Sequence, residues 1–297
     1  MSTPAFASAA PPVQAVEFKN ILFATDFSEP SMKALPYATG LARKFGANLI
    51  LCHVLTPTPL AVGAPEAAPY LYQAETESST RALDDLLHSP PLHDIKSKSI
   101  MPAGILSEEL KAAIEENKVD LVIAGTHGRT GVRRLLLGSS AEEICRIADC
   151  PVLTVGPDLA PRGAVDIKSI LVPCDLSEES AYAVPCVAAL ARAFGAQVTV
   201  LHVMPEDLAT NPDAKKLAEP VRKTMLHRFE SQFAELKPEF VIEFGESVET
   251  IIAVARKKNA DLIALGVRDA FLPGFQLRSS VAYRVMTAAH CPVLTCR

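Results

Sequence analysis

The sequence lacks several patterns that would place it in a common class of protein. No apolar run approaches the roughly 18 residues that a membrane-spanning helix needs. Its seven cysteines include no C-x2-C pair, which argues against a zinc site. There is neither a G-x4-G-K-S/T loop nor an obvious pair of acidic metal ligands, so efficient phosphoryl transfer is not indicated.

A strong excess of one charge and a secretory leader are also missing. A net charge of −5 and a pI near 5.8 give no general attraction to nucleic acid or to an anionic membrane, and we expect neither as a partner. The N-terminus has no basic region and is interrupted by Pro11 and Pro12, so residues 1–17 are predicted to be a disordered leader. The odd number of cysteines, mostly in apolar segments, favours free thiols in a reducing cytoplasm.

The chain contains two copies of one module. Ile21–Glu29 matches Ile170–Glu178 at an offset of 170 − 21 = 149 residues, and Asp120–Ile123 matches Asp261–Ala264 at an offset of 261 − 120 = 141. With 297 residues, 49% of them hydrophobic, each copy is long enough to be a globular domain with its own core. We therefore predict a first domain over 18–156, a linker over 157–166 and a second domain over 167–297.

Within each copy, short apolar runs alternate with helical patterns. In the first copy, strands are predicted at 20–25, 48–54, 96–101, 120–125 and 152–155, and helices at 30–46, 73–88, 106–117 and 139–148. This alternation, with strands apolar on both faces, is typical of an α/β fold in which helices cover both faces of a parallel sheet. Ligands bind such sheets beyond the carboxyl ends of the strands. Segment 55–72, rich in proline and alanine, is predicted to be a loop over that edge, either a lid or a passive insertion.

A glycine pattern after the fourth predicted strand indicates phosphate binding. Gly125 and Gly128 form a G-x2-G pair, and Gly138 with two serines opens the next helix after nine intervening residues. We expect Gly125 and Gly128 to adopt positive φ and to let an anion approach the backbone, and the helix N-terminus to favour negative charge. The alternative is structural, with Gly125 as a strand-end turn and Ser139 as an ordinary helix cap.

Two further polar positions at strand ends have structural alternatives. Asp26 could accept hydrogen bonds from a ribose or a base, or could form an Asx turn or helix cap, and Asp175 repeats it. His53 and His202 end the second strand of each copy and are predicted to be core or strand-end histidines. His127, inside the glycine loop, is the better candidate for a phosphate contact, although no neighbouring carboxylate makes it a convincing base.

Together these segments resemble the universal stress protein family in its tandem-domain form. The resemblance rests on Asp26 after an apolar strand, on Leu51–Val54, on Asp120–Gly128, on Leu135–Ser139 and on Cys150–Leu153, and it covers nearly the whole chain. It implies two five-stranded parallel sheets of order 3-2-1-4-5. It also implies that 152–155 pairs with 293–296 within the chain as a pseudo-dimer, and a homodimer of chains is left open.

The resemblance further implies ATP, with or without Mg²⁺, as the ligand of the first domain. The expected nucleotide-binding residues are Ala24, Thr25, Asp26, Val54, Gly125, Thr126, His127, Gly128, Arg129, Gly138, Ser139 and Ser140. In the second copy Gly266 remains, but Asp269, Ser279 and Ser280 stand at the positions of Gly128, Gly138 and Ser139. A carboxylate there would repel phosphate, so we expect the second site to bind ATP poorly or not at all.

The function expected from the sequence is that of a cytoplasmic ATP-binding protein of stress response or signalling, with slow or no hydrolysis and no catalytic residues. One alternative is an ATP-splitting enzyme that adenylates a substrate, but the serine- and glycine-rich loop such enzymes carry after strand one is here Thr25–Pro30. A second alternative is a protein-interaction module with vestigial sites, against which the intact glycines argue.

Overall fold

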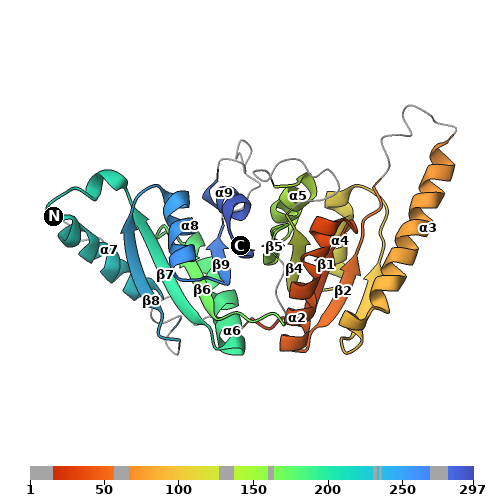
Figure 1. Cartoon of the computed structure of the whole chain (residues 1–297), viewed down its shortest axis with the longest axis horizontal. Helices are drawn as coiled ribbons and strands as arrows, with labels where there is room; N and C mark the ends of the chain where they lie inside the picture. The colour runs from red at the N-terminus through yellow and green to blue at the C-terminus, as the bar shows by residue number, and fades with distance from the viewer. Residues whose placement is uncertain are drawn as a thin grey trace.

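A computed structural model of the chain shows one continuous ten-stranded sheet built from two similar halves (Figure 1). The structure describes residues 16–56, 67–126, 137–159, 164–229, 233, 236–267 and 280–297. The strand order is β3-β2-β1-β4-β5-β10-β9-β6-β7-β8, so each half has the order 3-2-1-4-5 that the family resemblance implies.

The elements follow the predicted alternation in both halves. In the first half they are β1 (Asn20–Ala24), α1 (Glu29–Met32), α2 (Leu35–Phe45), β2 (Asn48–Cys52), α3 (Ala68–Leu87), η2 (Pro90–Leu92), β3 (Ser97–Ile100), α4 (Leu106–Glu116), β4 (Leu121–Gly125), α5 (Ser139–Ile147) and β5 (Val152–Val155). In the second half they are β6 (Ser169–Pro173), η3 (Glu179–Ala183), α6 (Val184–Phe194), β7 (Gln197–Met204), η4 (Glu206–Leu208), α7 (Ala214–Phe229), β8 (Glu239–Phe244), α8 (Ser247–Lys257), β9 (Leu262–Gly266), α9 (Val281–Ala288) and β10 (Val293–Cys296).

The two halves join edge to edge through their last strands. Strand β5 pairs with β10 in antiparallel fashion, with Leu153 opposite Leu294, while the other neighbouring strands run parallel. The expected pairing of 152–155 with 293–296 is therefore observed within the chain. Because each last strand now has a partner on both sides, the edges of the ten-stranded sheet are β3 and β8.

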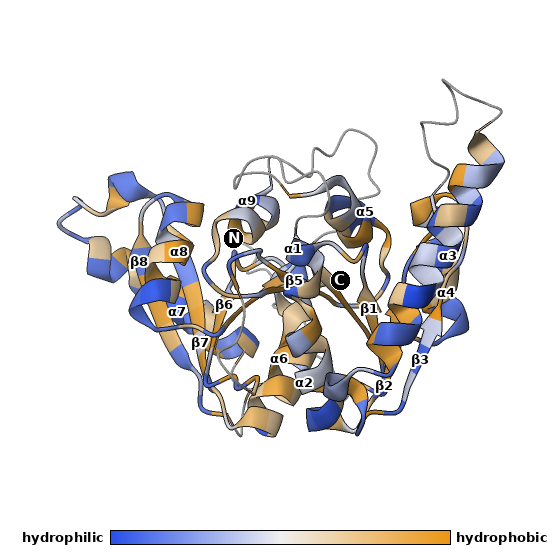
Figure 2. Cartoon of the chain, turned by 45° about the vertical axis from the view of Figure 1, so that its right-hand side comes forward, coloured by the Kyte–Doolittle hydropathy of each residue, from blue (hydrophilic) through white to orange (hydrophobic). Residues whose placement is uncertain are grey.

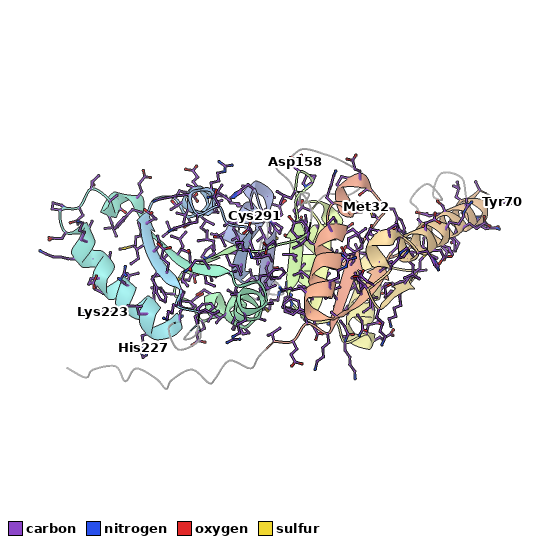
Figure 3. All side chains as sticks on the ribbon, turned by 60° about the horizontal axis from the view of Figure 1, so that its bottom comes forward. Met32, Tyr70, Asp158, Lys223, His227 and Cys291 are labelled. Atoms are coloured by element: carbon purple, nitrogen blue, oxygen red, sulfur yellow. The ribbon has the colours of Figure 1, made fainter. Side chains whose placement is uncertain are left out.

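Helices cover both faces of the sheet, as the apolar strands predict. On β1, Ile21 and Phe23 face a core shared with α2, α3, α6 and α7, while Leu22 faces a second core shared with α4, α5, α8 and α9. Coloured by hydropathy, the strands are largely apolar and the outer helices carry much of the polar surface (Figure 2). In Figure 3 the exposed side chains of Tyr70, on α3, and Lys223, on α7, mark the helices at opposite ends of the sheet.

Two of the predicted helix boundaries were wrong. The single helix expected at 30–46 is two helices, α1 and α2, because Pro36 has no N–H to bond the carbonyl of Met32. Helix α3 begins at Ala68, so residues 68–72 of the predicted loop are helical, while 57–66 lie outside the described residues. Ser28 caps α1, and Gly46 ends α2 with a φ of 63°.

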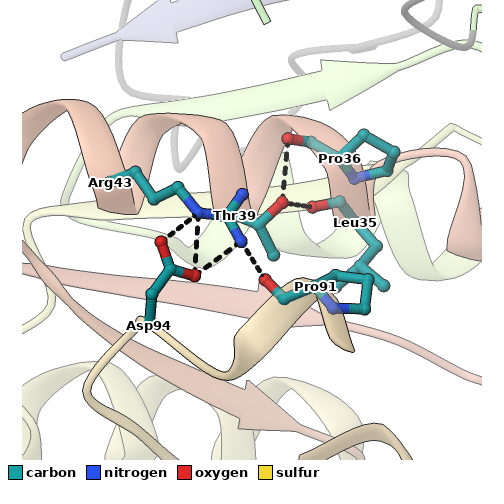
Figure 4. A network of polar contacts seen from close by, with 6 residues as sticks. All are labelled: Leu35, Pro36, Thr39, Arg43, Pro91 and Asp94. Atoms are coloured by element: carbon teal, nitrogen blue, oxygen red, sulfur yellow. Dashed lines mark hydrogen bonds and ion pairs between the residues drawn. The ribbon is translucent and has the colours of Figure 1, made fainter. Parts of the chain in front are cut away.

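Helix α2 is tied to the segment that leads into edge strand β3. The Arg43 guanidinium bonds both carboxylate oxygens of Asp94, with Nε 2.8 Å from Oδ2, and also donates to the carbonyl of Pro91 (Figure 4). Thr39 donates to the carbonyls of Leu35 and Pro36 within the helix. These contacts fix the outer part of the first half, against which α3 packs through Leu83 and Leu86.

Candidate functional site

The predicted site residues that the structure describes line one pocket. The pocket has a volume of about 260 Å³ and lies where β1, β2 and β4 end. Its lining includes nine of the twelve expected residues, namely Ala24, Thr25, Asp26, Val54, Gly125, Thr126, Gly138, Ser139 and Ser140. The other three, His127, Gly128 and Arg129, lie outside the described residues. Segments 100 residues apart in the sequence therefore meet at one edge of the sheet, as the parallel topology predicts.

The turn after β1 holds Asp26 at the pocket. Its Oδ1 accepts hydrogen bonds from the amide of Ser28 at 3.0 Å and from the hydroxyl of Ser28 at 2.6 Å. This is the Asx turn that the sequence offered as the structural alternative. Asp175 makes the same two bonds to Ser177 in the second half. The turn is thus common to both copies, and it places a carboxylate in each pocket.

His53 supports this turn from the neighbouring strand. It is buried, and its Nδ1 lies 2.8 Å from the carbonyl oxygen of Thr25, while its ring packs 4.7 Å from that of Phe27. His202 makes the matching contact to Cys174 at 2.9 Å. Both histidines are strand-end residues that join the first two strands of their half, which confirms the structural interpretation.

Gly125 is required by packing and does not adopt the expected positive φ. A Cβ atom at this position would lie 2.7 Å from the Cα of Ser31 and 2.9 Å from the carbonyl oxygen of Pro30. At Gly266, a Cβ atom would overlap the carbonyl oxygen of Glu179 in the same way. The glycine is kept in both copies because a helical segment packs against the end of the strand, with backbone atoms too close to leave room for a Cβ atom. This contact explains the glycine without a bound phosphate.

The N-terminus of α5 forms the part of the pocket best suited to an anion. Gly138 is its cap residue and supplies no side-chain cap, and Ser139 and Ser140 are exposed in the first turn. The amide of Gly138 donates to the carbonyl of Thr126 at 2.7 Å, which anchors the helix start beside the end of β4. First-turn amides without an internal cap, in line with the helix dipole, favour a negatively charged ligand.

The N-terminus of the equivalent helix in the second half is capped by a serine side chain. Ser280 caps α9, and its hydroxyl accepts a hydrogen bond from the amide of Tyr283 at 3.1 Å. The pocket beside it is smaller, about 160 Å³, and Cys174 and Val281 stand where the first pocket has Thr25 and Ser140. The second pocket therefore lacks the hydroxyls of Thr25 and Ser140, and the Tyr283 amide in the first turn of α9 is already bonded to Ser280.

Several lining residues were not predicted from the sequence. Glu75 comes from the inner face of α3, Leu106 and Leu110 come from α4, and Ser31 and Thr56 follow β1 and β2. Their contribution depends on how the helices pack over the strand ends. A periodic pattern could have shown the buried face of α3, but no local signal indicates that Glu75 reaches the pocket.

The pocket wall includes one buried thiol. Burial raises the pKa of the Cys52 thiol in the pocket wall to about 12, so it is not a thiolate nucleophile at neutral pH. Among the described residues, no group of three or more histidine, cysteine or acidic side chains is arranged to hold a metal ion. In the described part of the chain, no helix is both long and apolar enough to span a membrane.

Comparison with known proteins gives one consistent result. The model of the universal stress protein family matches residues 17–156 and 166–297. A universal stress protein of Methanocaldococcus jannaschii is 33% identical over 140 residues, which span 46% of this chain and 82% of that protein. A universal stress protein of Thermus aquaticus is 35% identical over 139 residues, which span 46% of this chain and 98% of its own.

Among solved structures, the fold is similar over nearly the whole chain. A universal stress protein from Archaeoglobus fulgidus superposes with a TM-score of 0.74 at 21% identity, covering 95% of this chain and 99% of its own. At that identity the likeness concerns the fold, including the arrangement of two modules in one chain.

Proposed function

The chain belongs to the universal stress protein family, and on this premise we propose that its first domain binds one molecule of ATP, with or without Mg²⁺, in the pocket at the ends of β1, β2 and β4. The observation that carries the proposal is the N-terminus of α5, whose cap residue offers no side chain and whose first turn faces the pocket. A helix start of this kind favours phosphate.

The two ends of the pocket differ in chemistry, which suggests an orientation for the ligand. Gly138 and Ser139 lie at the β4 end, and Glu75 and Val54 lie at the β2 end, with β1 between them. Two strand spacings separate these ends, about 10 Å. An extended ligand with an anionic end and a hydrogen-bond-donating end fits this polarity. We place the phosphates at α5, the ribose near Asp26 and the base near Glu75.

These features are explained better by a role in binding, in stress response or signalling, than by a catalytic role. The described part of the pocket has no group of three or more histidine, cysteine or acidic side chains arranged to hold a metal ion, and its buried thiol is protonated. We therefore propose slow hydrolysis or none. All seven cysteines are free, which supports a reducing cytoplasmic setting for this function. The adenylating alternative would need a phosphate loop after β1, where the chain instead forms the Asx turn of Asp26.

The proposal is tested by measuring the nucleotide that copurifies with the protein and then titrating the nucleotide-free protein with ATP and ADP by calorimetry. We expect binding at micromolar concentrations, and we expect Gly138→Asp, which sets a carboxylate at the start of α5, to abolish it. Absence of copurified nucleotide together with a Kd of about 1 mM or weaker would remove the proposal. Turnover above about one per second would favour the adenylating or hydrolytic alternative.

A further inference from the structure

The first domain's helix α5 is held by side chains of the second domain. The amide of Leu137, the residue before Gly138, donates a hydrogen bond to the hydroxyl of Tyr283 at 3.2 Å. Tyr283 lies on α9, and α9 and α5 flank the junction of the two halves (Figure 1). Leu137 and Tyr283 are only 3% and 4% exposed, so this bond is shielded from water.

The second domain also contacts α5 further along its length. The Arg297 guanidinium donates to the carbonyls of Cys145 and Ala148 at the C-terminal end of the helix, the latter at 3.2 Å. A cation at this end satisfies the last carbonyls and complements the helix dipole. Between the two ends, the Cys145 thiol lies 3.9 Å from the sulfur of Met286 on α9. The helix that presents its N-terminus to the pocket is thus fixed at both ends by the other domain.

The bond from Leu137 matters because of its position. A buried backbone N–H without an acceptor is unfavourable, so the Tyr283 hydroxyl helps to hold the chain that enters Gly138 in this path, together with the bond from the Gly138 amide to the Thr126 carbonyl. That path sets where the amides of Gly138, Ser139 and Ser140 point. The first domain has Glu142 at the position equivalent to Tyr283, since 283 − 141 = 142.

We propose that Tyr283 is a positioning residue for the phosphate end of the first domain's pocket, so that the second domain completes the nucleotide site without binding nucleotide itself. The inference rests on the proposed function, because it assigns the phosphates to α5. It gives the second domain a role that its own pocket does not supply.

The test compares wild-type protein with Tyr283→Phe, which keeps the buried ring and removes only the hydroxyl. We expect the Kd for ATP to rise about tenfold, as for loss of the acceptor of a buried amide, and the Kd for adenosine to change less than about twofold. Tyr182→Phe, at an exposed tyrosine of the same domain, is the matched control and is expected to bind both ligands like wild type.

Two further measurements keep the inference testable if Tyr283→Phe folds poorly. Arg297→Gln removes the cation at the other end of α5. It is expected to raise the Kd for ATP about threefold relative to the Kd for adenosine. Hydrogen exchange of wild-type protein without nucleotide should show a protected Leu137 amide, and this protection should be lost in Tyr283→Phe while α9 stays protected.

The outcomes separate this inference from the proposed function. Wild-type protein that binds no nucleotide contradicts both. Wild-type protein that binds ATP, with a Tyr283→Phe variant that binds it equally well, overturns the positioning role alone. A variant that loses ATP and adenosine affinity by the same factor also overturns it, because a general structural role would act on both ligands.

Discussion

The two pockets of this chain share a framework and differ in the part that would meet an anion. Both have the Asx turn after the first strand, the strand-end histidine and the glycine that a helical segment crosses. They differ at the helix start, where Gly138 leaves α5 without a side-chain cap and Ser280 caps α9. The features common to both copies hold the strand ends and helices together in each half. The differences lie at the end of the pocket where we place the phosphates.

The largest effect is expected from placing a carboxylate at the start of α5, and the same change in α9 should have no effect on ATP affinity. Ser140→Asp should weaken ATP binding at least about a hundredfold, because a fixed negative charge would face the phosphates in a partly dry site. Val281→Asp makes the same change at the equivalent position of α9 and should leave ATP affinity unchanged. Both variants should fold, since Asp is favourable in the first turn of a helix. Calorimetric titration measures the difference, and equal losses in the two variants would remove the distinction between the pockets.

A second comparison concerns the two glycines that end β4 and β9. Gly125→Ala and Gly266→Ala should each lower the free energy of unfolding by about 1–3 kcal/mol, because the new methyl group meets backbone atoms. Denaturant unfolding measures this change. If Gly125→Ala left stability unaltered and only abolished nucleotide binding, the glycine would be a ligand contact and the packing explanation would be wrong.

Glu75 gives the first pocket an acidic residue from α3, whereas no α7 residue lines the second pocket. If the base lies there, its carboxylate accepts from the 6-amino group of adenine and repels the 6-oxo group of ITP. Glu75→Gln should lower the preference for ATP over ITP about fivefold, since an amide can also donate to an oxo group.

The ratio of the two dissociation constants is the useful measurement for Glu75, because removing a negative charge changes the affinity of both triphosphates alike. Glu77→Gln, on the exposed face of the same helix, is the matched control. An unchanged ratio in Glu75→Gln would show that the base does not lie against α3. A changed preference for ATP over 2′-deoxy-ATP would instead place the ribose there.

The smallest expected effect concerns a cap that only the second domain has. Glu246 caps α8, and the hydrogen bond from the amide of Glu249 holds the pKa of its carboxyl below the usual 4.5. The nearby Arg284 lowers this pKa further. A lowered pKa in the folded state stabilises the protein above pH 4.5, and the contribution is lost as the pH falls below that value. Since the group is exposed, Glu246→Gln should lower the free energy of unfolding by only a few tenths of a kcal/mol at pH 7.

This difference between wild type and Glu246→Gln should shrink steadily as the pH falls below 4.5, because the carboxyl becomes protonated first in the unfolded state and then in the folded state. Ile105 is the cap residue of α4, the equivalent helix of the first domain, and has no titrating group there. Ile105→Gln should therefore change stability by an amount that does not vary over this pH range. A Glu246→Gln effect that persisted unchanged at pH 3 would contradict the assigned cause.

The sequence predicted the elements that depend on local pattern. The duplication and the buried strands follow from spacing and residue type, and the structure has them. The break between α1 and α2 was missed because Pro36 was counted within a continuous helical pattern. The start of α3 was missed because Tyr70 and its neighbours are exposed and show no buried periodicity.

The pocket was predictable only in part. Residues at strand ends converge by topology, so Asp26, Val54 and Gly125 were expected together and lie together. Glu75 and Tyr283 reach the site through packing between elements far apart in the chain, which no local pattern records. The packing contact of Gly125 was not predicted, because a glycine beside a ligand and a glycine beside a helix look alike in the sequence.

The central claim, one nucleotide per chain at the first domain, is tested most directly by the stoichiometry of ATP binding in a calorimetric titration of nucleotide-free protein. The account predicts one ATP per chain for wild-type protein and for Val281→Asp, and none for Ser140→Asp at the same concentrations. Two ATP molecules per chain, or a single site that survives Ser140→Asp and disappears in Val281→Asp, would contradict it.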